Sequence, residues 1–318
     1  MNMIPPAVPA AISSATLVQS VMTAAGLLLP HLEQGRRIDA TSLRAAMEAA
    51  FGASDSAGAW DWKTAYEATE VATVLFLRKY GSALHQRAGS ASAMLPLLDR
   101  ILTLLPSQTR RSEEMQARQQ FSTPVAYGLA AVTAAAITPA DRVLEPSAGT
   151  GLLAILAEIS GGMLMLNELA DLRAGLLDVL FPSVRVSRFD AAQIHDHLAA
   201  DLVPSVIVMN PPFSAMANVQ AHMADTTLRH VSSALARLAP GGRLVSITGS
   251  NFSPEHPNWR DAFIQLQETA RVVFSASVDG AVYAKHGTTF DTKLTVIDKI
   301  AADDPASFPQ SAGLAPDV

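Results

Sequence analysis

The chain has 318 residues, of which 49% are hydrophobic and 16% charged, so it can form one large domain or two of ordinary size around a buried core. It contains no cysteine, which excludes disulfides, thiolate nucleophiles and cysteine-ligated zinc and is typical of a cytoplasmic protein. The formal net charge of −6 argues against a protein that grips duplex DNA unaided, because such proteins usually present a basic face. Binding of DNA through a local basic patch or through a DNA-binding partner is compatible with this net charge.

Residues 1–118 are predicted to form an all-helical N-terminal region. Apolar residues recur at helical spacing in four segments separated by Gly, Ser, Asp or Pro, namely 11–32, 40–51, 61–80 and 91–105. Asp61 has the position of an N-cap. The uncharged stretch 10–29 has the length of a membrane span, but no basic residue precedes it and Ser, Thr and Gln interrupt it, so we expect a buried helix.

Residues 119–300 alternate between strand and helix patterns and follow a polar boundary stretch at 108–120. Short apolar runs predict strands at 141–145, 163–167, 184–189, 206–209, 243–248, 271–278 and 293–299, and longer periodic segments predict helices at 152–160, 170–180, 221–238 and 259–268. This alternation predicts an α/β fold with a mainly parallel seven-stranded sheet, helices on both faces and a final antiparallel pair. Residues 301–318 lack periodicity, so we expect a flexible tail or a linker to a missing C-terminal part.

A glycine turn follows the first predicted strand and precedes a helix. It reads Glu145-Pro146-Ser147-Ala148-Gly149-Thr150-Gly151. Small residues let the backbone approach a ligand closely, and the helix N-terminus that follows offers N–H donors. Dinucleotide enzymes and kinases use the same device, but the spacing here is not G-x-G-x-x-G and the strand ends in an acid followed by proline.

Two further acids end the second and third predicted strands. Glu168, which follows Asn167, is placed to accept hydrogen bonds from both ribose hydroxyls of a nucleoside. Asp190, which precedes Ala191, can accept from the exocyclic amine of a bound adenine. Each acid alone could equally be a solvated residue at a strand end. Together with Glu145, however, they predict a nucleoside pocket along one sheet edge.

The run Asn210-Pro211-Pro212-Phe213 follows the fourth predicted strand and contains the candidate catalytic residues. Two prolines give a rigid turn. The side-chain oxygen of Asn210 and the carbonyl of Pro211 can both accept hydrogen bonds from one planar amino group, which keeps the nitrogen lone pair available for attack on a sulfonium methyl. Phe213 offers a flat surface on which a base can stack.

These motifs resemble those of class I, amino-directed methyltransferases. The segments concerned are EPSAGTG, NELADLRAG, RFDAA and NPPF, in this order. In addition, Phe121-Ser122-Thr123-Pro124 resembles the segment that DNA N6-adenine methyltransferases place over the methionine part of the cofactor, and its position before the glycine turn matches their gamma order.

The resemblance implies a Rossmann-like fold, S-adenosyl-L-methionine as cofactor and adenine N6 in DNA as acceptor. Glu145 would lie near the methionine amino group, Glu168 would hold the ribose and Asp190 the adenine, while Asn210, Pro211 and Phe213 would hold the target base. The cofactor site would comprise Phe121, Ser122, Thr123, Pro124, Glu145, Pro146, Ser147, Ala148, Gly149, Gly151, Asn167, Glu168, Asp190 and Ala191. The target adenine would be flipped out or single-stranded.

Residues 283–294 resemble a stretch of large plasmid and phage proteins that join an N-terminal methyltransferase domain to a strawberry-notch-like helicase. The resemblance implies a helicase domain or partner C-terminal to this chain. Tyr283 or Phe290 would then give a second stacking surface for a flipped base, or both would pack beside the strand that follows them. Free-standing gamma enzymes carry a separate target-recognition domain, for which we find no counterpart here.

Three functions fit the residues. The leading one is an adenine-specific DNA methyltransferase that uses direct transfer and needs no metal. The second keeps the chemistry but has a protein glutamine or an RNA amino group as acceptor, because NPP turns serve those enzymes as well. The third is a cofactor-binding scaffold without activity, against which the intact acids and the intact NPPF argue.

Overall fold

The structure is a computed structural model that describes residues 13–108, 122–212 and 220–318, with only the backbone described for 220–225. Its centre is one eight-stranded sheet with the order β3-β2-β1-β4-β5-β7-β6-β8. The strands are β1 (Arg142–Glu145), β2 (Met163–Asn167), β3 (Val186–Ser187), β4 (Val206–Met209), β5 (Arg243–Gly249), β6 (Arg271–Val278), β7 (Thr292–Asp298) and β8 (Leu314–Ala315). Strands β1 to β5 are parallel, and β7 lies antiparallel between β5 and β6.

This strand order confirms the Rossmann-like α/β fold that the sequence predicts, with β8 as an eighth strand beyond the seven predicted. Because β1, β2, β3 and β4 are parallel, their carboxyl ends meet at one edge of the sheet. The motifs that follow these strands are therefore brought to the same edge.

Helices cover both faces of the sheet. Alternate residues of each strand point to opposite sides, so each face has a hydrophobic core of its own. In β1, Val143 belongs to one hydrophobic core and Leu144 to the other. The first core includes α6 (Val125–Ala134), α7 (Leu152–Ile159) and α8 (Asp171–Leu180). The second core includes α9 (Ile194–His197), α10 (Gln220–Arg237) and α11 (Pro257–Gln267).

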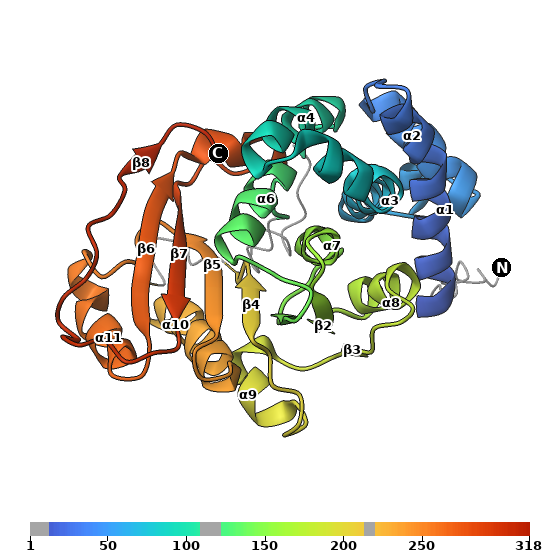
Figure 1. Ribbon diagram of the computed structural model, residues 1–318. Helices are drawn as coiled ribbons and strands as arrows, with labels where there is room; N and C mark the ends of the chain where they lie inside the picture. The colour runs from blue at the N-terminus through green and yellow to red at the C-terminus, as the bar shows by residue number, and fades with distance from the viewer. Residues whose placement is uncertain (1–12, 109–121, 213–219) are drawn as a thin grey trace.

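The N-terminal region is helical, as predicted, and packs outside α7 and α8, on the side of the molecule away from β6 and β8 (Figure 1). It comprises α1 (Ser14–Glu33), α2 (Ala40–Phe51), the short η1 (Asp55–Ala57), α3 (Trp62–Ala88) and α4 (Ala91–Leu104). Asp61 caps α3 by accepting a hydrogen bond from the Thr64 N–H, at 2.8 Å, which confirms the predicted N-cap.

Helix α1 is the one described helix whose length and composition would suffice to cross a membrane. Its residues Val21, Ala24, Ala25 and Leu28 are each 0% exposed and belong to the hydrophobic core against α3. A buried core helix satisfies the same criterion, and these four side chains fit the buried helix that the sequence predicts.

Helix α3 continues eight residues beyond the end that the sequence predicts at residue 80. Gly81 suggests a break there, but a Cβ at this position would clash with Ile159 Cδ1 of α7. The glycine therefore permits close packing of two helices rather than ending one of them. The C-cap is Gly89, with a φ of 70°.

Residues 301–318, for which the sequence predicts a flexible tail or linker, pack along the outer edge of the sheet. Strand β8 pairs in parallel with β6. The side chain of Gln267 donates hydrogen bonds to the carbonyls of Pro305 and Ser307, at 2.9 and 2.8 Å. Composition alone missed this segment because its order comes from bonds to an existing strand rather than from its own periodicity.

Candidate functional site

The glycine turn between β1 and α7 adopts the tight conformation that its small residues permit. Gly149 and Gly151 have φ values of 55° and 91°, in the left-handed region. A Cβ at Gly151 would lie 2.7 Å from the Phe181 ring, so close packing as well as backbone geometry requires glycine there. Gly151 also caps α7, which places the helix N-terminus beside the turn.

Glu168 lies across this turn, directly after β2. Its Oε2 accepts a hydrogen bond from the Gly149 N–H and its Oε1 one from the Ala170 N–H, both at 2.8 Å. The side chain is 6% exposed. The acid predicted to hold a ribose is therefore fixed by backbone donors against the turn predicted to approach the cofactor.

Asn167 joins three strand ends through four hydrogen bonds. Its Nδ2 donates to the carbonyls of Pro146 and Phe189 at 2.8 and 2.9 Å, and its Oδ1 accepts from Ser187 Oγ and the Phe189 N–H, both at 2.9 Å. It is 0% exposed. Asn167, which the sequence places among the cofactor residues, thus supports the site from beneath by holding the loops after β1 and β3 in register.

Glu145 is a deeply buried acid at this edge. It is 4% exposed, and burial, with a smaller contribution from the charge of Glu168, raises its pKa well above the usual range. Its Oε2 is buried and has no hydrogen-bond partner among the residues that the structure describes. A buried acceptor of this kind fits a cationic amino group, which would lower the pKa again.

Asp190 follows β3 and is exposed. Its Oδ1 accepts a hydrogen bond from the Ala192 N–H at 2.9 Å and so caps η2 (Ala191–Gln193). Ala191 is buried directly beside it. The predicted adenine contact is therefore accessible from solvent at the same edge as Glu145 and Glu168.

Asn210 follows β4 and is held by a segment that comes much earlier in the chain. Its Nδ2 donates a hydrogen bond to Thr123 Oγ1 at 2.8 Å, across 87 residues of sequence. Pro124 and Pro211 are buried, while Ser122 and Pro212 are half-buried. Two of the predicted site residues, Phe121 and Phe213, lie outside the described residues.

The segment after β6 supports Asn210 and Ser122 from the other side. It forms η3 (Gly280–His286), and its Tyr283, at 0% exposure, packs edge-on against Tyr127 with 5.9 Å between ring centroids. Burial raises the pKa of Tyr283 well above its usual value, and a hydrogen bond with Asn210 opposes this shift. Tyr283 is thus a packing residue beneath Asn210, whereas Phe290 is 55% exposed.

No protein-family model matches the chain, and a search of curated proteins finds no match. Among solved structures, it is similar to TrmN from Thermus thermophilus, with 20% identity and a TM-score of 0.43 over 59% of this chain and 52% of that one, so it spans about half of TrmN. A Listeria monocytogenes protein assigned to the class I S-adenosylmethionine-dependent methyltransferases is 14% identical, with a TM-score of 0.48 over 96% and 92% of the two chains. The M protein of the type I restriction enzyme EcoKI is 14% identical, with a TM-score of 0.47 over 91% and 68%.

Several residues of the site escaped the sequence analysis. Glu70 of α3 accepts a hydrogen bond from Thr150 Oγ1 in the glycine turn, at 2.8 Å. His286 Nδ1 lies 2.9 Å from Ser122 Oγ, and burial lowers the pKa of this histidine to about 4. Glu70 belongs to no motif, and the resemblance of residues 283–294 assigns no role to His286, so only the packing of distant segments shows that the two residues reach the site.

Proposed function

We propose that this chain is an S-adenosylmethionine-dependent methyltransferase that acts on an exocyclic amino nitrogen, N6 of adenine in DNA. The hydrogen bond between Asn210 and Thr123 carries the proposal. It joins the turn that the sequence assigns to the acceptor base with the segment that it assigns to the methionine end of the cofactor.

The strand-end acids support the cofactor. Glu145 offers a buried acceptor oxygen for an ammonium group, and Glu168 is fixed against the glycine turn by two backbone donors. Asp190 is exposed at the same edge and can accept from an adenine amine. When bound, S-adenosylmethionine supplies a sulfonium methyl group that a neutral amine can attack.

The orientation of Asn210 supports an amino acceptor. Since its Nδ2 donates to Thr123, Oδ1 is the atom of this side chain that can accept from a substrate amine. The Pro211 carbonyl would be a second acceptor on a rigid turn. The amine nitrogen forms a bond to the methyl carbon while the carbon–sulfur bond breaks, and the nitrogen then loses one proton to solvent. Positioning and fixed dipoles supply the catalysis.

Within this proposal, the target adenine is single-stranded or flipped out of the duplex. The net charge of −6 weighs against strong unaided binding of duplex DNA. A helicase domain or partner would provide such a target strand, in keeping with the resemblance of residues 283–294.

Transfer of a radiolabelled methyl group from S-adenosylmethionine to a panel of acceptors tests the proposal. The panel comprises single-stranded DNA, duplex DNA, RNA and protein. We expect labelling of DNA, and of single strands above duplex. Asn210→Ala should lose transfer but keep cofactor binding, while Asn258→Ala, at an exposed asparagine of α11, serves as the matched control. Labelling of RNA or protein but not of DNA would show that DNA is not the acceptor. Labelling that Asn210→Ala leaves unchanged would contradict the catalytic role of Asn210.

A further inference from the structure

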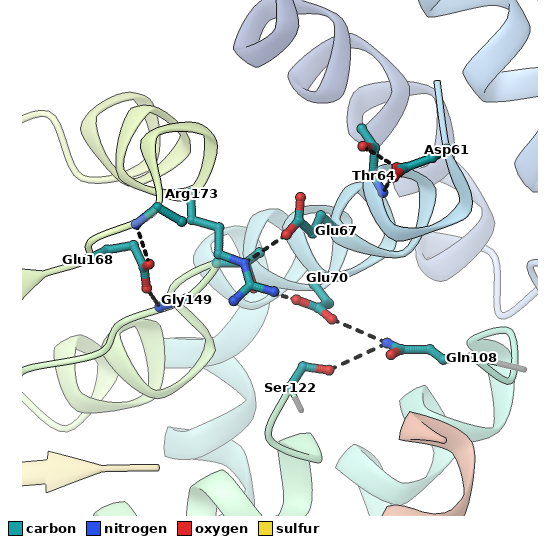
Figure 2. A network of polar contacts seen from close by, with 11 residues as sticks. Asp61, Thr64, Glu67, Glu70, Gln108, Ser122, Gly149, Glu168 and Arg173 are labelled. Carbon is teal, nitrogen blue, oxygen red and sulfur yellow. Dashed lines mark hydrogen bonds and ion pairs between the residues drawn. The ribbon is translucent and has the colours of Figure 1, made fainter. Parts of the chain in front are cut away.

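A helix of the N-terminal region supplies side chains to the edge of the sheet where the cofactor motifs meet. Glu67 of α3 points toward Arg173 of α8, and the carboxylate of Glu70, one turn further along α3, reaches Gln108 (Figure 2). Glu70 Oε2 accepts a hydrogen bond from Thr150 Oγ1 at 2.8 Å. Thr150 lies between the two left-handed glycines of the turn and is 4% exposed.

The other carboxylate oxygen of Glu70 reaches a second part of the site. Gln108 Nε2 donates to Glu70 Oε1 at 3.2 Å and also approaches Ser122 Oγ at 3.4 Å. Ser122 adjoins Thr123, which holds Asn210. One carboxylate therefore connects the glycine turn with the segment that contacts the catalytic asparagine.

A buried ion pair fixes α3 at this position. Arg173 Nε lies 2.7 Å from Glu67 Oε1, with side-chain exposures of 12% and 4%. Arg173 is also attracted by Glu70 and Glu168. A second cross-link, between Arg78 and Glu158 at 3.0 Å, joins α3 to α7 farther along the same helix and is more exposed.

We propose that Glu70 is a positioning residue of the cofactor site, which acts through the hydroxyl of Thr150 to hold the glycine turn in its binding conformation. The inference rests on the proposed function. The N-terminal helical region is then part of the cofactor site and not an independent module beside it.

The mechanism follows from the backbone of the turn. Gly149 and Gly151, both in the left-handed region, flank Thr150. Glycine loses more conformational freedom on ordering than other residues do. An anchored hydroxyl between them reduces the number of conformations that the turn has to give up when the cofactor binds. Loss of the anchor should therefore weaken cofactor binding while transfer at saturating cofactor continues.

The test compares Thr150→Val, which removes the hydroxyl at nearly constant shape, with Thr150→Ser, which keeps it, and with Glu70→Met, which removes both acceptor oxygens at nearly constant side-chain length. The matched control is Glu158→Gln, which weakens the more exposed ion pair between α3 and α7 and leaves Glu70 and Thr150 unchanged. Calorimetry gives Kd for S-adenosylmethionine, and initial rates give kcat and the KM for it. Urea unfolding reports stability separately.

We expect Thr150→Val and Glu70→Met to raise Kd and KM for the cofactor about tenfold, which corresponds to about 1.4 kcal/mol, with kcat little changed. Thr150→Ser should restore most of the affinity and Glu158→Gln should bind as the parent does. Unchanged Kd in Thr150→Val, or a loss equal to that of Glu158→Gln, would overturn the inference. A parent protein that binds no cofactor would instead refute the proposed function, so the two failures are distinct.

Discussion

Removal of the Arg173 guanidinium should be among the most destabilising single changes in this protein. In Arg173→Met, Glu67 keeps a carboxyl that is 4% exposed but loses the cation 2.7 Å away. Breaking a buried pair in this way typically costs about 3–5 kcal/mol. Arg188→Met is the matched control, because Arg188 pairs at 3.2 Å with Asp171 and Asp178 of the same α8 but is 45% exposed. Exposed pairs contribute about 0–1 kcal/mol.

The loss of stability in Arg173→Met should increase with pH. Burial already raises the pKa of Glu67, and Arg173 opposes that shift. Without Arg173 the pKa of Glu67 in the folded state rises further above the ordinary 4.5. The neutral carboxyl of Glu67 therefore stabilises the fold at low pH, and this contribution is lost as pH rises through the folded-state pKa. The gap between Arg173→Met and the parent should therefore widen from pH 5 to pH 8.

Urea unfolding of the parent, Glu67→Leu, Arg173→Met, Arg188→Met and the double variant Glu67→Leu/Arg173→Met measures these free energies. The double variant should recover much of the loss, since an apolar pair can replace a buried ion pair. The stabilising role of Arg173 is refuted if Arg173→Met costs no more than Arg188→Met, or if the loss in the double variant equals the sum of the losses in Glu67→Leu and Arg173→Met.

Two further predictions concern the glycine turn and the buried histidine. Gly151→Ala should lower the free energy of unfolding by about 2–4 kcal/mol, because its Cβ would meet the Phe181 ring at 2.7 Å, whereas Gly149→Ala, which has open space, should cost about 1 kcal/mol. Equal losses in urea unfolding would contradict this. Because burial lowers the pKa of His286 from 6.5 to about 4, its contribution to stability is complete above pH 6.5 and is lost as pH falls toward 4. His286→Asn should remove up to about 3 kcal/mol of that pH dependence, and an unchanged slope between pH 4.5 and 7 would refute it.

The sequence predicted best what depends on short segments. β2, β4 and β6 begin and end where their apolar runs do. For β4, which is buried at all four positions, burial of both strand faces shows directly in composition. The sequence also predicted that one edge of the sheet brings together Glu145, Glu168 and Asn210, because parallel strands align their carboxyl ends.

The contacts that bind distant segments could not be predicted in the same way. Thr150 and Glu70 are 80 residues apart, and neither the acid nor the threonine differs in pattern from many surface residues. Gly81 suggests a helix end by propensity, yet contact with α7 retains it inside α3. In both cases the structure depends on how one element packs against another, and a short stretch of sequence does not predict such packing.

The most direct test of the central claim is mass spectrometric measurement of N6-methyladenine in DNA digested after incubation with the protein and S-adenosylmethionine. We expect N6-methyladenine to increase with time in the parent and in Asn258→Ala, and to stay at background in Asn210→Ala. An absence of N6-methyladenine from single-stranded and duplex DNA, in a protein that binds the cofactor, would contradict it.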